Sequence, residues 1–417
     1  MIQVNRTTLP NGLRIVHNYD SATAMVALHV SVDVGAADEH PGRTGLAHLM
    51  EHLMFGGSAN IPDFDGAIEA AGGFNNAYTS NDRTVFYSVA PAQNAETLFW
   101  AESDRLMAPL LSEKSLEVQR SVVIEEFKQT CLNRPYGDMT HLLRSMVYSR
   151  HPYRWPVIGL EISHIEEVSL SEVHEFFERH YTPANTTLVV TGHITWEETL
   201  RLSEKWFGTI PARTTYHRDL PSEPEQTEAH EMTVRRNVPQ TAITIAYPMP
   251  GFEHSDYRTC DVLTDLLAAG RASRMRRNLL MATDLFTDVD ACILGSRDPG
   301  YITLSCRLRR DDDADIARAR ERLVAEATRP GSADDISMRE LQRIRNRHAS
   351  DYTFGLIDYM SVGQTLVQAD MQGEDINTDI ARYDSVTAHE IAHAVRTYIR
   401  PERSNTLIYR PENRSVD

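Results

Sequence analysis

Two histidines and a glutamate lie close together in the segment Thr44–Phe55, which reads TGLAHLMEHLMF. The apolar residues around His48 and His52 predict a helix, on which the two histidines are four residues apart. Because an α-helix turns once every ~3.6 residues, both imidazoles lie on one face and can bind a single metal ion. Glu51 is close enough to reach a water molecule on that ion. This His-x-x-Glu-His order inverts the commoner zinc-peptidase motif, so the segment predicts a hydrolytic zinc site.

A second candidate is HEIAH at residues 389–393, which has the commoner order. Catalytic zinc takes three protein ligands and leaves a further position open for water. For His48 and His52 a third ligand is available on a separate predicted helix, at Glu125 or Glu126. Few carboxylates follow the HEIAH segment, so we expect its histidines, His389 and His393, to lie on a helix surface.

Hydrophobic periodicity predicts the elements that must position these residues. Alternating apolar side chains indicate strands at Val26–Val34, Asn75–Ser80 and Thr84–Val89. Apolar stripes at helical spacing indicate helices over residues 92–107 and 113–130, and the second of these carries both candidate glutamates.

The second half of the chain is a diverged copy of the first. Val168–Pro183 aligns without a gap with Val386–Pro401, and Gly45–Gly56 aligns with Thr259–Gly270. In the second half, the metal-site positions hold Val262, Asp265 and Leu266. We therefore expect only the first half to bind metal by this motif. The predicted domains are residues 1–213 with the zinc site and residues 230–417 without one, joined by a polar, proline-containing linker at 214–229.

Composition excludes several other classes of protein. The 417 residues carry a formal net charge of -17, which argues against nucleic acid or anionic membrane as the main partner. The four cysteines form no Cys-x-x-Cys pair, so we expect buried thiols rather than a disulfide framework. A strand-turn-strand pattern begins at once and no membrane-length apolar run follows, so we expect a soluble, cytoplasmic protein without a signal peptide.

Taken together, the motifs resemble those of the pitrilysin family, in its short-chain branch that includes mitochondrial processing peptidase. The resemblance is carried by His-x-x-Glu-His, by QRSVVIEE at Gln119–Glu126, by NNAYTS at Asn75–Ser80, by PYRWPVIG and by the tandem halves. It implies an α+β fold of two tandem homologous domains, each a mixed, mostly antiparallel sheet packed by helices.

The resemblance also implies a set of site residues and one Zn²⁺ per chain. The implied metal ligands are His48, His52 and Glu126, with Glu51 as the base that takes a proton from the attacking water and passes it to the leaving amine. The implied residues around them are Gln119 and Glu125. The implied substrate-binding strand, which would add a peptide to a sheet edge, contains Asn76, Ala77 and Tyr78. A purely structural strand at 75–80 is the alternative.

Two positions depart from the family pattern. Gln119 stands where a glutamate is usual. Leu280 and Thr287 stand where active members carry an arginine and a tyrosine that contact the substrate. We therefore expect a heterodimer with a related subunit that supplies the missing pair, with a homodimer as the alternative. The nearby Arg274, Arg276 and Arg277 are interpreted as a solvated basic face.

These observations predict a zinc-dependent endopeptidase that hydrolyses short or unfolded peptides, as the zinc-bearing subunit of a dimer. The alternative is a non-catalytic peptide-binding or assembly subunit with a vestigial zinc site. No nucleophile elbow or paired cysteine motif indicates a serine or cysteine hydrolase.

Overall fold

The computed structural model describes residues 1–213 and 216–412. Residues 214–215 of the predicted linker and 413–417 of the predicted second domain lie outside the described residues. Contacts group the chain into two compact units, each built from separate stretches. Unit 1 contains residues 1–128, 155–221 and 353–377; unit 2 contains residues 129–154, 222–352 and 378–417.

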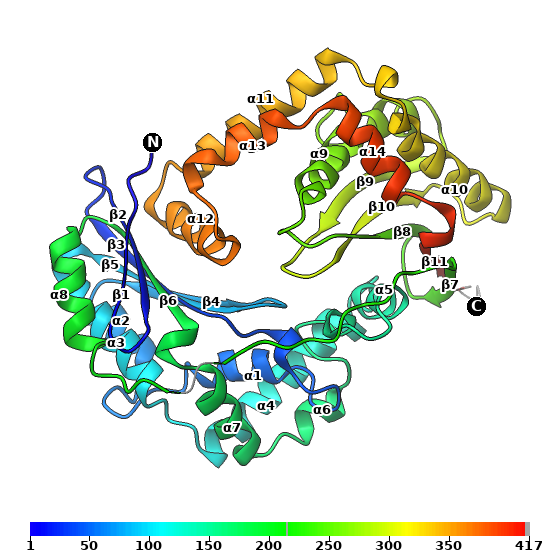
Figure 1. The fold of residues 1–417 in the computed structure, drawn as a ribbon. Helices are drawn as coiled ribbons and strands as arrows, with labels where there is room; N and C mark the ends of the chain where they lie inside the picture. Colours follow the sequence, from blue (N-terminus) through cyan, green and yellow to red (C-terminus); the bar gives the residue numbers. More distant parts are fainter. Residues whose placement is uncertain (214–215, 413–417) are drawn as a thin grey trace. The chain divides into compact units, whose positions relative to one another are not determined.

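Unit 1 is built on a mixed sheet with the strand order β1-β2-β6-β3-β5-β4 (Figure 1). Only the β2–β6 pair is parallel, and the other neighbours are antiparallel. The strands are β1 (Asn5–Thr8), β2 (Arg14–Tyr19), β3 (Met25–Val32), β4 (Phe74–Thr79), β5 (Thr84–Pro91) and β6 (Thr186–Gly192). The sheet confirms the predicted mixed, mostly antiparallel arrangement.

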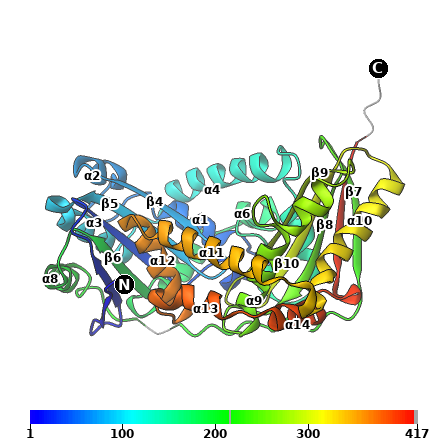
Figure 2. The same cartoon turned by 90° about the horizontal axis from the view of Figure 1, so that it is seen from above.

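The two faces of this sheet are covered by different parts of the chain. Leu28 and Val30 of β3 join the main hydrophobic core together with helices of the first half. These helices are α1 (Leu46–Leu53), α2 (Phe64–Ala70), α3 (Ala95–Met107), α4 (Glu113–Phe127), α6 (Ile162–Glu166), α7 (Leu170–His180) and α8 (Trp196–Trp206). His29 points to the opposite face, because side chains alternate along a strand. There it meets α12 (Tyr359–Gln372), which comes from the second half of the sequence (Figures 1 and 2).

Unit 2 repeats the same sheet without the first strand, in the order β7-β11-β8-β10-β9. Its β7–β11 pair is parallel and the remaining neighbours are antiparallel, as in unit 1. The strands are β7 (His230–Arg236), β8 (Ala242–Met249), β9 (Phe286–Leu294), β10 (Gly300–Leu308) and β11 (Asn405–Pro411). The helices are α5 (Met139–Val147), α9 (Asp256–Ala268), α10 (Asp313–Thr328), α11 (Met338–Gly355), α13 (Asp379–Ser385) and α14 (Ala388–Tyr398).

Local contacts repeat between the two halves as well. Arg120 of α4 donates to the carbonyl of Val168 at 2.6 Å, and Arg345 of α11 donates to the carbonyl of Val386 at 2.9 Å. The helices that follow these carbonyls, α7 and α14, each begin with a capping box. The predicted pair of homologous halves is therefore confirmed, while the exact domain boundaries stay a prediction.

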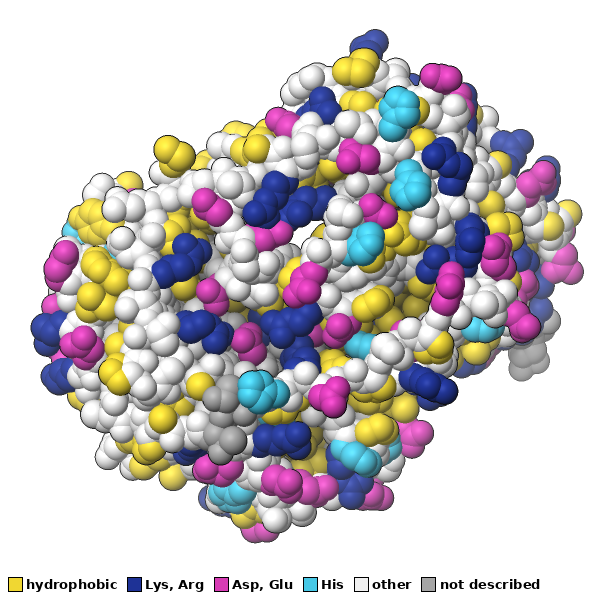
Figure 3. Space-filling view, viewed as in Figure 1, with side chains coloured by type: hydrophobic (Ala, Val, Ile, Leu, Met, Phe, Trp, Pro, Cys, Tyr) yellow, Lys and Arg dark blue, Asp and Glu magenta, His cyan; other side chains and the backbone are white. Residues whose placement is uncertain are grey.

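Among the described residues, no helix has both the length and the apolar character that a membrane crossing requires. Acidic and basic side chains are interspersed on the face shown in Figure 3. All four cysteines are unpaired; three are buried as predicted, and Cys292 is exposed.

Candidate metal centre

The helix that carries the two histidines begins at a turn that requires glycine. Gly45, the residue before α1, has φ 90°, and a Cβ there would lie 2.9 Å from the carbonyl oxygen of Ile158. Glu39, which precedes α1 in the sequence, caps its first amide groups: the Glu39 carboxylate accepts hydrogen bonds from Gly45 N at 2.9 Å and Ala47 N at 2.8 Å. Glu39 is buried, and burial raises the pKa of its carboxyl. This capping contact orients α1, and no sequence signal had identified it.

The structure brings the three predicted ligands together. The Nε2 atoms of His48 and His52 lie 3.7 Å and 3.5 Å from Oε2 of Glu126 on α4. One ligand atom from each residue lies within 4.8 Å of the other two, and no other such cluster of histidine, cysteine, aspartate or glutamate occurs in the described part of the chain. The exposed fraction rises from 12% for the His48 side chain to 40% for Glu126, so the cluster is open to solvent on one side.

Glu125 and Glu126 point to different surroundings, as adjacent residues on a helix must. Glu125 is 62% exposed and forms an ion pair with Lys128 at 2.6 Å, so the structure does not bring Glu125 to the cluster. Gln119, two turns before Glu126 on α4, does reach the cluster through a hydrogen bond with His52.

The protonation states favour metal binding. Burial, followed by the neighbouring His52, lowers the pKa of His48 to about 4, so its imidazole is neutral at pH 7. Contact with His52 lowers the pKa of Glu126, despite partial burial, and keeps that carboxylate ionised. Burial lowers the pKa of His52, but Glu126 and Glu51 outweigh it and raise the pKa overall. A metal ion would displace the proton that these acidic neighbours attract.

The donor set and its spacing fit zinc. With Zn–N bonds of about 2.0–2.1 Å, neighbouring ligand atoms of a tetrahedron lie about 3.3 Å apart. The two separations that involve Glu126, 3.5 Å and 3.7 Å, exceed this by only a few tenths of an ångström, and the third, between the two histidines, is within 4.8 Å. His48, His52 and Glu126 can therefore hold one zinc ion with small side-chain adjustments.

The predicted base, Glu51, lies beside this cluster and is held by Thr79. The Thr79 hydroxyl donates to Oε2 of Glu51 at 2.5 Å, and Thr79 also lies 3.4 Å from the hydroxyl of Thr84. Burial raises the pKa of Glu51, although the hydrogen bond from Thr79 acts in the opposite direction. Thr79 is not among the predicted site residues, because no local signal in the sequence relates the end of β4 to α1.

Thr79 ends β4, whose other residues are the predicted substrate-binding positions. β4 is the edge strand of the unit 1 sheet and pairs only with β5 among the described residues. Asn76 is exposed, and its Oδ1 accepts a hydrogen bond from Ala77 N at 2.8 Å. The Tyr78 hydroxyl donates to Gln364 of α12 at 3.0 Å, which fixes its ring within unit 1. Their role in substrate binding stays a prediction.

The positions expected to hold an arginine and a tyrosine lie in unit 2. Leu280 ends the short helical turn η6 (Arg276–Leu280) and packs against the core of that unit. The Thr287 hydroxyl donates to Gln240 at 3.2 Å. The interpretation of Arg274 as part of a solvated face is wrong, because its side chain is 5% exposed and paired with Glu340. His389 and His393 of the rival motif are exposed on α14, as predicted.

Comparison with known proteins places this geometry in a family. Residues 14–158 match the family described as Insulinase (Peptidase family M16), and residues 167–347 match the Peptidase M16 inactive domain. The chain belongs to the M16 peptidase family. This confirms the pitrilysin resemblance, and the M16 inactive-domain match covers much of the half in which the metal-site residues are replaced.

Relatives of the M16 chain include named zinc proteases. The zinc protease PqqE of Helicobacter pylori is 25% identical over 417 residues, which cover 97% of this chain and 92% of that protein. The mitochondrial-processing peptidase subunit beta of Saccharomyces cerevisiae is 27% identical over 206 residues, or 49% of this chain and 44% of that protein. The crystal structure of a protease from Helicobacter pylori matches with a TM-score of 0.89 and 24% identity, covering 99% of this chain and 100% of that chain.

Proposed function

We propose that this M16 chain is a zinc-dependent endopeptidase that hydrolyses short or unfolded peptides. The observation that carries the proposal is the convergence of His48, His52 and Glu126, with Glu51 uncoordinated beside them. A purely structural zinc site has no use for a carboxylate held next to an open position. Zinc bound there supplies a Lewis acid and a water of pKa about 7.

The chain's own residues would then perform the remaining steps. Glu51 takes the proton of the attacking water and delivers it to the leaving amine, since burial has raised its pKa toward neutral pH. Thr79 keeps the Glu51 carboxylate in one orientation through its hydroxyl. The exposed edge of β4 binds the peptide backbone by adding a strand, which gives loose sequence preference.

The partner proposal rests on Leu280 and Thr287. Neither side chain can donate to a developing negative charge as an arginine or tyrosine would, because leucine has no donor and the Thr287 hydroxyl already binds Gln240. A related subunit that carries the missing pair would complete the active site in a heterodimer.

A peptide-digest assay tests both parts of this proposal. The purified chain is incubated with a mixture of short peptides, alone and together with a co-expressed paralogue, each with and without a chelator. We expect chelator-sensitive cleavage that increases strongly with the paralogue. Full activity of the chain alone would overturn the heterodimer, and cleavage that resists the chelator would overturn the zinc mechanism.

The second candidate is a non-catalytic peptide-binding or assembly subunit. Leu280 and Thr287 favour it, because neither can replace the arginine or the tyrosine that active members carry. Peptide binding without turnover, in both the single chain and the mixture, would establish this candidate instead.

A further inference from the structure

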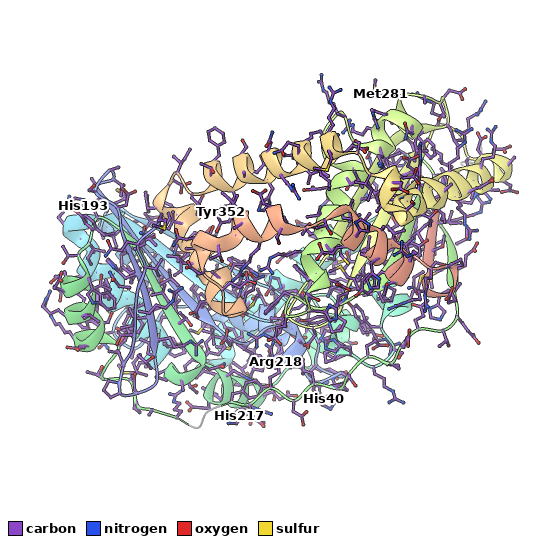
Figure 4. The ribbon with its side chains drawn as sticks, turned by 45° about the horizontal axis from the view of Figure 1, so that its top comes forward. His40, His193, His217, Arg218, Met281 and Tyr352 are labelled. Atoms are coloured by element: carbon purple, nitrogen blue, oxygen red, sulfur yellow. The ribbon has the colours of Figure 1, made fainter. Side chains whose placement is uncertain are left out.

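Unit 2 contains a cavity of about 540 Å³ that is unusually rich in arginine. Its volume is within the range of about 300–1,000 Å³ that small-molecule sites occupy. Three stretches of chain line it, at residues 272–278, 329–335 and 337–343. The first includes part of η6, which ends just before Met281, labelled in Figure 4. The basic lining residues are Arg274, Arg277, Arg329, Arg339 and Arg343, and the acidic ones are Asp335 and Glu340.

One of these carboxylates is already fully engaged. Arg274 donates from Nε and Nη2 to the two oxygens of Glu340 at 2.9 Å and 3.0 Å. Despite burial, these bonds and those from Ser337 lower the pKa of Glu340 to about 2. Two further arginines are less closely paired. Arg277 lies 3.8 Å from the same Glu340, and Arg329 lies 4.0 Å from Glu326, which also accepts a bond from Asn278. The cavity therefore carries an excess of positive charge.

Two guanidinium groups of the lining have buried donors that lack acceptors. The Arg274 side chain is 5% exposed, and its Nη1 has no hydrogen-bond partner among the described residues. Nη2 of Arg343 is likewise buried without a partner among them. Burial, together with repulsion from Arg277 and Arg347, lowers the pKa of Arg343, although Glu340 opposes this shift. Like charges and unsatisfied donors are held together here at a cost that a bound anion would offset.

We propose that this cavity is a binding site for a small phosphate-bearing molecule, whose oxygens accept hydrogen bonds from Arg277, Arg339 and Arg343. The planar guanidinium fork suits the bidentate recognition of phosphate and carboxylate oxygens. A phosphate group carries more negative charge than a single carboxylate, about -1.5 to -2 at pH 7, and offers three strong acceptor oxygens, so a diphosphate can bind several converging arginines at once. The site contains none of the metal-centre residues, so it does not depend on the proposed peptidase function.

Isothermal titration of the full-length chain with inorganic pyrophosphate tests this proposal, at constant ionic strength. Because Arg277 and Arg339 are exposed, Arg277→Gln combined with Arg339→Gln should leave the fold intact. We expect this double variant to raise the Kd for pyrophosphate at least tenfold, and Arg343→Gln to do the same. Arg322→Gln, an exposed arginine on α10 outside the cavity, serves as the matched control and should leave the Kd unchanged.

Three results would overturn the proposal. The first is no pyrophosphate binding by the folded wild-type chain at about 1 mM, a limit that corresponds to a very weak site. The second is an equal loss of binding in the Arg322 control, which would show non-specific attraction to basic residues. The third is tighter binding of citrate than of pyrophosphate, which would assign the cavity to polycarboxylates instead.

Discussion

The helix pair α1 and α4 in unit 1 and the pair α9 and α11 in unit 2 have related sequences but different chemistry. In α9, Val262 and Leu266 replace the two histidines and are buried in the core. Six residues after Arg120, α4 carries Glu126; six residues after the equivalent Arg345, α11 carries Asp351, which is exposed and paired with Arg347. The same scaffold has therefore kept its packing and lost its metal-binding atoms.

A group of polar side chains on α9, α11 and α13 of unit 2 interact with one another. Asp261 of α9 accepts a hydrogen bond from the Tyr383 hydroxyl, and His348 of α11 contacts Asp379 at 2.6 Å. His348 and Tyr383 also stack with ring centroids 3.6 Å apart. In unit 1, by contrast, ligand atoms of His48, His52 and Glu126 face a common point. The comparison shows that the repeat preserves the fold, while the function depends on a few side chains.

The largest expected effect is the difference in peptide turnover between substitutions of Glu51 and of Asp265, two acidic residues at equivalent positions in the two halves. Glu51→Gln should lower peptide turnover by about 10³-fold, because the base is lost while the three ligands remain. Asp265→Asn should leave turnover unchanged. Turnover is measured in the peptide-digest assay, with zinc content as a check on the ligands. Equal turnover by Glu51→Gln and the wild type would refute the assigned base.

Two buried residues, one in each unit, should respond to acid in opposite ways. His29 in unit 1 is fully buried, neither of its ring nitrogens has a hydrogen-bond partner among the described residues, and burial lowers its pKa to about 4. The unfolded chain, with an ordinary His pKa of about 6.5, binds the proton first, so this histidine lowers stability as pH falls from about 6.5 to 4. At about pH 4, His29 lowers the free energy of unfolding by about 3 kcal/mol. Burial raises the pKa of Asp265 in unit 2 to about 6, so Asp265 adds stability as pH falls from about 6 to below 4.

Other groups also make the stability of the wild type depend on pH, since the buried acids Asp38 and Glu39 in unit 1 have raised pKa values. The difference in the free energy of unfolding between each variant and the wild type therefore isolates the contributions of His29 and Asp265. Urea unfolding from pH 7 to 4.5 is compared for the wild type, His29→Gln and Asp265→Asn. The wild type should lose stability relative to His29→Gln and gain it relative to Asp265→Asn. Parallel curves for all three proteins would show that neither shift exists.

Adjacent glutamates on α4 sharpen the comparison at the metal site itself. Glu126→Gln removes the charged ligand and should weaken zinc binding by at least about 100-fold, because even residues that only contact the ligands change metal affinity by about 10–100-fold. Glu125→Gln changes an exposed residue paired with Lys128 and should leave zinc affinity unchanged. Competition with a chromogenic chelator measures both affinities. A larger loss in Glu125→Gln would reverse the assignment of the third ligand.

The smallest expected effect concerns the hydrogen bond from Thr79 to Glu51. Thr79→Val keeps the side-chain shape but removes the hydrogen-bond donor. It should lower kcat about tenfold, because one such hydrogen bond contributes about 1.4 kcal/mol and this energy corresponds to a tenfold change in rate. Zinc content and KM should stay unchanged, and Thr79→Ser should restore kcat. If Thr79→Ser is as slow as Thr79→Val, the hydroxyl does not position the base.

The sequence predicted those parts of the molecule that depend on local spacing. The four-residue interval of His48 and His52, and the two faces of α4 at Glu125 and Glu126, follow from helix geometry alone. The contact between Thr79 and Glu51 could not be predicted, since it depends on where β4 ends relative to α1.

Contacts across long stretches of sequence were also beyond prediction. Residues 353–377 pack on the unit 1 sheet, with Gly363 so close to His29 that a Cβ would lie 2.2 Å from the imidazole. Residues 216–221, of linker composition, place Arg218 between Asp38 and Asp82, at 2.6 Å and 3.0 Å; Arg218 is labelled in Figure 4. Periodicity identifies the buried face of an element, but it does not identify the surface that covers this face.

The central claim is that α1 and α4 hold a zinc ion, and the zinc content of the purified chain tests it most directly. Plasma mass spectrometry measures this content in the wild type and in a variant that carries, at the two histidine positions, the residues found at the equivalent positions of unit 2. The test variant combines His48→Val with His52→Leu. We predict one zinc per wild-type chain and none in the folded double variant. A wild-type chain that copurifies with no zinc and takes none up, or a double variant that retains it, would contradict the assignment of the metal centre to α1 and α4.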